Sequence, residues 1–106
     1  MSFLEVQTSF KLAEDAKRIA RRILEERLAA CANIVRGESM YHWNGKLEEE
    51  EEVFVYFKTD EEHYEALETR LKALHPYEVP MIIALPFRDG LSDYLSWLKE
   101  NISKEK

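Results

Sequence analysis

The sequence predicts an α+β domain of the split βαβ, ferredoxin-like type: an antiparallel sheet in β-α-β-β-α-β order, two helices on one face, and an extra C-terminal helix. Three observations support it. They are an amphipathic stripe early in the chain, an Asn-Gly pair between two long strand-like runs, and a second helical segment that leads into a final apolar run. The length of 106 residues predicts a single domain spanning 1–106.

Residues 2–8 are a short segment of mixed polarity that we expect to form the first strand. Across residues 12–30, apolar side chains recur at three- and four-residue steps, which is the pattern of an amphipathic helix. Glu14 and Asp15 fall in its first turn, where acidic groups interact favourably with the helix dipole. The chain is therefore predicted to open with a strand and a helix that packs against the sheet.

Asn44-Gly45 is the strongest local signal in the sequence. It separates two strand-like runs, 31–43 and 46–58. Both residue types accept the positive φ angles that a two-residue hairpin turn requires. We therefore predict a long antiparallel ribbon, with a bulge or bend at Gly37 in its first arm.

The second half of the chain repeats the order of helix and then strand. Thr59 and Glu62 have the spacing of a capping box, which predicts that a second helix begins there. Pro76 is expected to end that helix. Residues 78–86 predict the fourth strand, and residues 92–102 predict a short C-terminal helix.

The predicted strands lack the alternation expected of a sheet with one face in water. Val55 and Phe57 fall on one face of the third strand, while Phe54 and Tyr56 fall on the other. Two helices cover only one face, so either the last helix and the ribbon fold over the second face or neighbouring subunits cover it. Because an exposed apolar face of this size marks an interface, the sequence favours neighbouring subunits.

The composition excludes several classes of function. Acidic residues number 21 against 15 basic ones, and 17 of the 21 are glutamate, so no nucleic-acid partner is expected. A single cysteine excludes an internal disulfide and a Cys₄ or Cys₂His₂ zinc site. The longest apolar run, 79–87, is too short to span a bilayer, and the first residues lack a secretory signal pattern. We expect a cytoplasmic protein with no membrane partner.

Four segments carry a combined motif: EERLAACANI (25–34), YHWNGKLEEEEEVFVYFKT (41–59), HPYEVPMIIALP (75–86) and DYLSWLK (93–99). Together they resemble the CutA family of divalent-cation tolerance proteins over nearly the whole chain. The resemblance implies a ferredoxin-like fold and a tight homotrimer in which strands of adjacent subunits meet edge to edge, similar in shape to the PII-type signalling proteins. It also implies binding of copper or another divalent metal ion and a role in metal tolerance.

Three metal ligands have been proposed in that family: a cysteine in the first strand, a histidine near the end of the second helix, and a glutamate after a Val-Pro pair. At the matching positions this sequence has Gln7, His75 and Met81. The resemblance therefore carries over only His75 from this set.

Cys31 and His75 are the candidate metal ligands. A thiolate suits Cu(I) or zinc, and an imidazole suits copper, zinc and nickel. Each residue has an alternative role. Cys31 lies among alanines and could be a small residue at a tight crossing, and His75 could interact with the last carbonyls of a helix.

Trp43, Lys58, Tyr77 and Glu78 are the candidate set for a ligand pocket or subunit interface. Each lies in a segment that matches the family. An aromatic wall with one lysine and one carboxylate suits a small ligand or an anion, and packing between subunits is the alternative. The run Glu48–Glu52 is expected to be a solvated strand, because alternation divides its carboxylates between two faces.

The leading functional hypothesis is a homotrimeric CutA-type protein that binds or responds to copper or another divalent metal ion. The alternative is a PII-like signalling or protein-interaction scaffold that binds a small ligand at subunit interfaces, with metal incidental. A third hypothesis is an enzyme with an inter-subunit site around His75, Tyr77 and Lys58. The sequence names no substrate for it, so we expect no catalytic residues and no enzyme activity.

Overall fold

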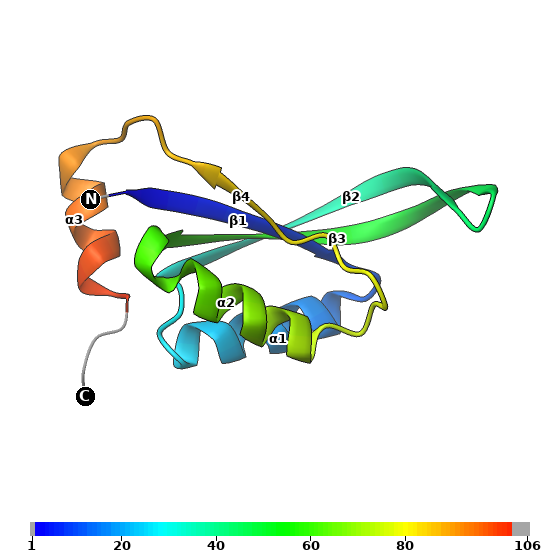
Figure 1. The fold of residues 1–106 in the computed structure, drawn as a ribbon, viewed down its shortest axis with the longest axis horizontal. Helices are drawn as coiled ribbons and strands as arrows, with labels where there is room; N and C mark the ends of the chain where they lie inside the picture. The colour runs from blue at the N-terminus through cyan, green and yellow to red at the C-terminus, as the bar shows by residue number, and fades with distance from the viewer. Residues whose placement is uncertain (1, 103–106) are drawn as a thin grey trace.

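The computed structural model describes residues 2–102. Its elements are β1 (Phe3–Phe10), α1 (Ala13–Glu25), β2 (Cys31–Trp43), β3 (Lys46–Asp60), α2 (Glu61–Leu74), β4 (Ile83–Pro86) and α3 (Ser92–Glu100). The sheet order is β2-β3-β1-β4, with antiparallel neighbours throughout. Helices α1 and α2 cover one face, and α3 lies at one end (Figure 1). The predicted α+β class is confirmed, and the strand order agrees with the split βαβ arrangement.

Helix α1 buries the apolar stripe that the sequence predicts, with Ile19 and Ile23 fully buried. It ends at Glu25, earlier than the predicted 12–30, because Arg27 adopts a left-handed conformation with φ of 62°. The N–H of Arg27 then donates to the carbonyl of Leu24, and the N–H of Leu28 donates to that of Ile23. This double hydrogen bond is a Schellman motif, which ends a helix and turns the chain toward β2.

The β2–β3 ribbon forms around the turn that was predicted. Asn44 and Gly45 have φ angles of 52° and 78°. Of the bulge or bend predicted at Gly37, the bulge is wrong, because the register runs without interruption and pairs Gly37 with Glu52. A Cβ at Gly37 would lie 2.8 Å from the ring of Phe54. The absence of a side chain there accommodates an aromatic ring.

Helix α2 begins one residue later than the capping-box prediction. Asp60 is the N-cap, and its carboxylate accepts a hydrogen bond of 2.9 Å from the N–H of His63. Thr59 is instead a buried strand residue whose hydroxyl donates to the carbonyl of Leu28 at 2.7 Å. The buried contact with the end of α1 thus determines the role of Thr59.

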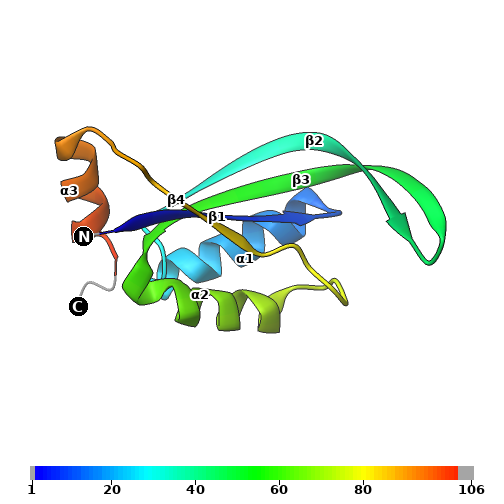
Figure 2. The ribbon, with the colours of Figure 1, turned by 45° about the horizontal axis from the view of Figure 1, so that its top comes forward.

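Strand β4 is shorter than the predicted 78–86, and only residues 83–86 pair with β1. The segment between α2 and β4 is a loop that contains two prolines, Pro76 and Pro80. Since proline has no N–H to donate to a sheet, this loop leaves the sheet and passes beside the end of β1 (Figures 1 and 2). Within residues 2–102, none of the helices combines the length and apolar character needed to cross a bilayer.

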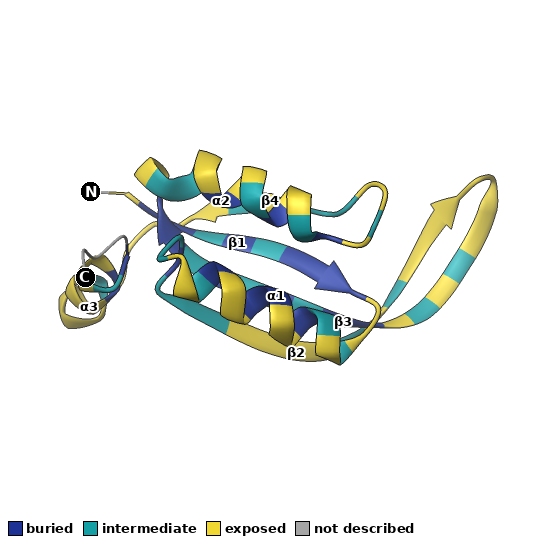
Figure 3. Ribbon diagram, turned by 90° about the horizontal axis from the view of Figure 1, so that it is seen from below, coloured by how far each residue is buried: buried dark blue, intermediate teal, exposed yellow. Residues whose placement is uncertain are grey.

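The core lies between the sheet and the two helices α1 and α2. Val6, Val55, Phe57, Leu67 and Leu71 are fully buried in it. Figure 3 shows this buried face of the sheet beneath α1 and α2. A second, smaller cluster joins α3 to the start of β1. Its buried members are Phe3, Leu98 and Ile102.

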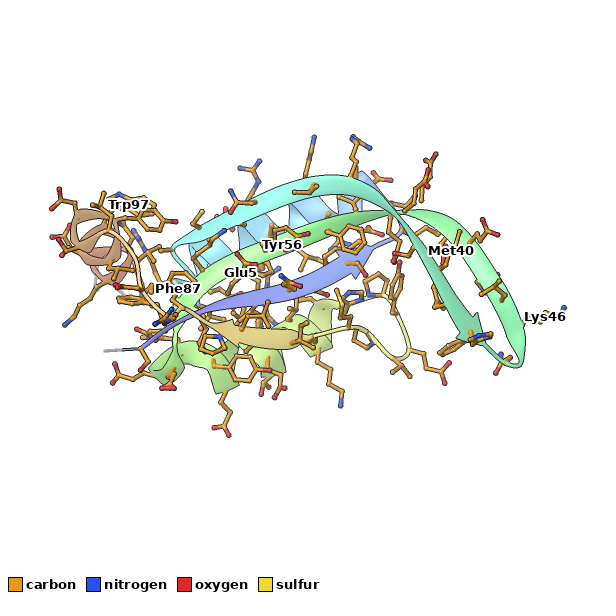
Figure 4. The ribbon with its side chains drawn as sticks, turned by 90° about the horizontal axis from the view of Figure 1, so that it is seen from above. Glu5, Met40, Lys46, Tyr56, Phe87 and Trp97 are labelled. Carbon is orange, nitrogen blue, oxygen red and sulfur yellow. The ribbon has the colours of Figure 1, made fainter. Side chains whose placement is uncertain are left out.

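The opposite face of the sheet is open within residues 2–102. Helix α3 stays at one end of the sheet and leaves this face uncovered (Figure 4). The side chains of Val35, Ile83 and Leu85 lie on this face and are exposed. The ribbon does not fold back over it either, because beyond the pair of Phe10 with Val53 it continues outward as a two-stranded hairpin (Figure 2). We call residues 37–52 the hairpin arm.

Candidate functional site

A pocket of about 330 Å³ opens at the base of the hairpin arm, where the loop after α2 meets the ribbon. Its walls combine three aromatic residues with three glutamates. The aromatic residues are Tyr41, Trp43 and Tyr77, and the glutamates are Glu50, Glu52 and Glu78. Strand alternation places Tyr41, Trp43, Glu50 and Glu52 on the same side of the ribbon, which is why they can line one cavity.

Glu52 is the most buried acid of the pocket, with only 6% of its surface exposed. Its Oε2 accepts hydrogen bonds from the hydroxyl of Ser9 at 3.2 Å and from the hydroxyl of Tyr77 at 2.6 Å. Ser9 is the second-to-last residue of β1, and Tyr77 is in the loop after α2. Glu52 therefore joins three segments that are far apart in the sequence.

His75 holds Tyr77 in place and does not itself line the pocket. Its Nδ1 accepts a hydrogen bond of 3.1 Å from the N–H of Tyr77, so its Nε2 carries the proton and donates to the carbonyl of Ser9 at 2.8 Å. The ring also stacks on Phe10, with centroids 4.3 Å apart. Burial lowers the pKa of His75 below 6.5. A neutral ring with both nitrogens engaged positions the loop.

The two tyrosines of the pocket are hydrogen-bond donors to carboxylates. Tyr41 donates to Glu50, and this bond raises the pKa of Tyr41 to about 12. Burial, and then the bond to Glu52, raises the pKa of Tyr77 above its ordinary value. Both phenols therefore keep their protons near neutral pH, and neither supplies a negative oxygen.

Lys58 lies outside this pocket, apart from the other three residues of the set predicted from the sequence. It faces the open side of the sheet, where its ammonium lies 3.3 Å from the carboxylate of Glu5 and donates to Asn33. The register places Lys58 opposite Cys31 and Glu5, six residues along β3 from Glu52. The pocket therefore contains Trp43, Tyr77 and Glu78 from the predicted set, but it lacks the predicted positive charge.

The two candidate metal ligands lie apart. Cys31 is half-buried at the start of β2, on the open face, with its Sγ 3.9 Å from an oxygen of Asn33. His75 packs against Phe10, whose side chain is part of the core beneath the helices. Within residues 2–102, no group of three His, Cys, Asp or Glu side chains is placed to hold a metal ion.

The two positions that replace family ligands have other contacts. Gln7 donates a hydrogen bond of 2.8 Å to Glu5 on the open face of the sheet. Met81 is part of the pocket lining. One of these positions therefore belongs to the pocket and the other to the polar cluster around Lys58.

Sequence reasoning missed Tyr41, Glu50, Glu52 and Ser9 as pocket residues. The ribbon register, which follows from the Asn44-Gly45 turn, could have placed the first three on the face of Trp43. The local pattern contained no signal that the loop after α2 would close over Glu52. That contact depends on His75, which is in hydrogen-bond contact with Ser9 and Tyr77.

The chain is similar to known proteins over nearly its full length. A family model described as "CutA1 divalent ion tolerance protein" matches residues 4–101. The divalent-cation tolerance protein CutA of Thermus thermophilus is 49% identical over 89 residues, which cover 83% of this chain and 86% of the relative.

Solved structures show the same similarity. The crystal structure of CutA1 from Oryza sativa has a TM-score of 0.94 at 40% identity, covering 99% of this chain and 97% of that one. A CutA from Archaeoglobus fulgidus, described as a periplasmic divalent cation tolerance protein, has a TM-score of 0.91 at 36% identity and covers 93% and 97% of the two chains. From the family match, the identities and the shared fold together, we conclude that this chain belongs to the CutA1 family of divalent ion tolerance proteins.

Proposed function

We propose that this chain acts in divalent-cation tolerance as a homotrimer that binds or responds to copper or another divalent metal ion. We also propose that it is cytoplasmic and performs no catalytic reaction. Family membership supports the cellular role, since relatives at 44–49% identity are named for it. The observation that carries the assembly is the open face of the sheet.

The open face supports self-association for two reasons. It exposes Val35 on the edge strand β2 and Ile83 and Leu85 on the edge strand β4, and exposed apolar side chains at both edges of a sheet face are typical of an interface. Strands β2 and β4 also form the two edges of the sheet, and unpaired edges offer backbone groups to another chain. Copies of the chain that meet through these edges and faces would bury the apolar side chains and pair the edge backbone groups.

The mass of the protein in solution tests the assembly. We expect three chains at micromolar concentration by sedimentation, and a lower mass for Ile83→Asp, which places a charge on the open face. Leu12→Asp is the matched control, because Leu12 is also exposed but lies at the start of α1. A monomer for the parent chain would contradict the proposal.

A chelator-competition titration with copper and zinc tests metal binding. Of the two candidate ligands, Cys31 has the more available donor atom, because both ring nitrogens of His75 have protein partners. We expect Cys31→Ser to weaken binding and His75→Gln to retain it. Since no second candidate ligand lies beside Cys31 in the part of the chain that the structure describes, further donors would come from neighbouring subunits. Absence of tight binding in the parent would overturn direct metal binding.

The pocket favours a second candidate function, a trimeric signalling or interaction scaffold that binds a small ligand with metal incidental. It brings Trp43, Tyr77 and Glu78 into one cavity of a size that small ligands occupy. A thermal-shift screen of small molecules in the presence of a strong chelator would test it. A ligand that raises the melting temperature without metal, and not after Trp43→Leu, would support the scaffold.

A further inference from the structure

The pocket at the base of the hairpin arm has the chemistry of a cation site. Glu50, Glu52 and Glu78 line it, and no lysine or arginine among the described residues does. Trp43, Tyr41 and Tyr77 supply aromatic surfaces, whose electron-rich faces attract positive charge. The absence of basic lining residues argues against the anionic ligand that Lys58 suggested from the sequence.

Glu52 has no cationic partner within the described residues 2–102. No lysine, arginine or histidine there lies within 4.0 Å of its carboxylate, although the residue is only 6% exposed. Its two hydrogen bonds come from neutral hydroxyls, and both reach Oε2. A buried carboxylate is costly without an opposite charge. Within residues 2–102, Oε1 of Glu52 therefore receives neither of these hydrogen bonds and no ion pair, and Glu52 lines the pocket.

The same contacts favour an organic cation over a bare metal ion. Ca²⁺ and Mg²⁺ require several convergent oxygen ligands. Here Tyr41 and Tyr77 occupy oxygens of Glu50 and Glu52 and remain protonated donors, and the described residues contain no arrangement of three ligands for a metal. A molecule that carries both charge and apolar groups uses the aromatic walls as well as the carboxylate.

We propose that this pocket binds a small organic ammonium ion, with its charged nitrogen against the aromatic residues Trp43 and Tyr77 and beside the carboxylate of Glu52. The volume of about 330 Å³ suits a compact ligand. The inference deepens the second candidate function, since it names the class of ligand, and it does not depend on metal binding.

Calorimetric titration of the full chain with two probes tests the proposal. Choline is the cationic probe, and 3,3-dimethyl-1-butanol is its neutral isostere, so the pair differs in charge at nearly constant shape. We expect choline to bind in the presence of a chelator and the neutral probe to bind at least tenfold more weakly. This comparison requires no variant and so cannot fail through misfolding.

Variants then locate the site. Trp43→Leu removes the aromatic face, and Glu52→Gln removes the charge while it keeps an oxygen for Ser9 and Tyr77. Each is expected to weaken choline binding about tenfold. Trp97→Leu is the matched control, because Trp97 is comparably exposed but lies on α3 at the other end of the sheet (Figure 4). It should bind choline as the parent does.

Three outcomes would overturn the inference: equal binding of the two probes, no choline binding at millimolar concentration, and choline binding that Trp43→Leu and Glu52→Gln leave unchanged. The scaffold function fails separately. If uncharged molecules stabilise the chain in the thermal-shift screen while choline does not bind, the scaffold remains and the ammonium assignment is wrong.

Discussion

The two halves of β3 share one strand and one register but have very different surroundings. From Val53 to Lys58 the strand pairs with β1 on one side and β2 on the other, and its inward side chains are buried beneath the helices. From Lys46 to Glu52 it pairs only with β2. There Leu47 is 61% exposed, and Met40 on the facing strand is 69% exposed. The comparison shows that neighbouring elements, and not the strand itself, provide burial and hence local stability.

The pocket spans this boundary. Ser9 and Tyr77 form the wall on the side of the domain core, and both donate hydrogen bonds to Glu52, the last residue of the arm. Tyr41 and Trp43 form the other wall and lie on the hairpin arm. The position of one wall therefore depends on the less supported half of the ribbon. A ligand or a partner that contacts both walls would hold the arm in place.

The largest expected effect comes from comparing one substitution in each half of β3. Phe57→Ala leaves a cavity in the core and should reduce the free energy of unfolding by about 3–5 kcal/mol. Leu47→Ala, on the arm, should change it by less than about 0.5 kcal/mol if the arm is free in water. Urea unfolding followed by circular dichroism measures both. A comparable loss at Leu47 would show that assembly covers the arm.

The turn at the tip tests how far the arm matters to the whole fold. Gly45 has a φ of 78°, so Gly45→Val should cost about 1–2 kcal/mol in the turn. Gly45→Asn is the control, because asparagine accepts this conformation. We expect hydrogen exchange to accelerate in residues 37–52 and to change little in α1 and α2. Equal acceleration in the helices would mean that the arm and the core unfold as one unit.

Because His75 holds Ser9 and Tyr77, the stability of that wall of the pocket is expected to depend on pH. Its pKa is lowered in the folded chain by burial, so the neutral ring contributes stability that is complete above about pH 6.5. That contribution is lost as the pH falls below 6.5 toward the lowered value, because the unfolded chain binds the proton more readily. Melting temperatures measured from pH 7.5 to 5 should fall less steeply for His75→Gln.

The smallest expected effect is a gain in stability from a substitution at the end of α1, outside the hairpin arm. Arg27 has a φ of 62°, a conformation that glycine adopts without strain, so Arg27→Gly should stabilise the chain by about 0.5–1 kcal/mol. Arg21→Gly is the control, because Arg21 is exposed within α1 and glycine there should destabilise by about the same amount. Thermal unfolding of the two variants should shift in opposite directions. Equal shifts would contradict the role of Arg27 as a helix terminator.

Local patterns predicted the elements well because their causes are local. The Asn44-Gly45 turn determines the ribbon, and the apolar stripe determines α1. The errors share a different origin. Gly37 accommodates the ring of Phe54, and Thr59 bonds to the end of α1.

Those contacts join segments that only the folded chain brings together. The pocket was predicted only in part, for the same reason. Trp43, Tyr77 and Glu78 were named from their motifs, whereas Glu52 was expected to be solvated. Its burial follows from the bonds to Ser9 and Tyr77, which no pattern within residues 48–52 contains.

The five consecutive glutamates of β3 have a consequence for how this chain can vary in length. Identical side chains cannot distinguish one alignment from the next, so the alignment of the arm must be set at its two ends, by Asn44-Gly45 and by the buried Val53. Adding one residue to each strand of the arm would turn Trp43 to the opposite side. The arm can therefore lengthen or shorten only in steps of two residues per strand if the pocket is to keep its tryptophan.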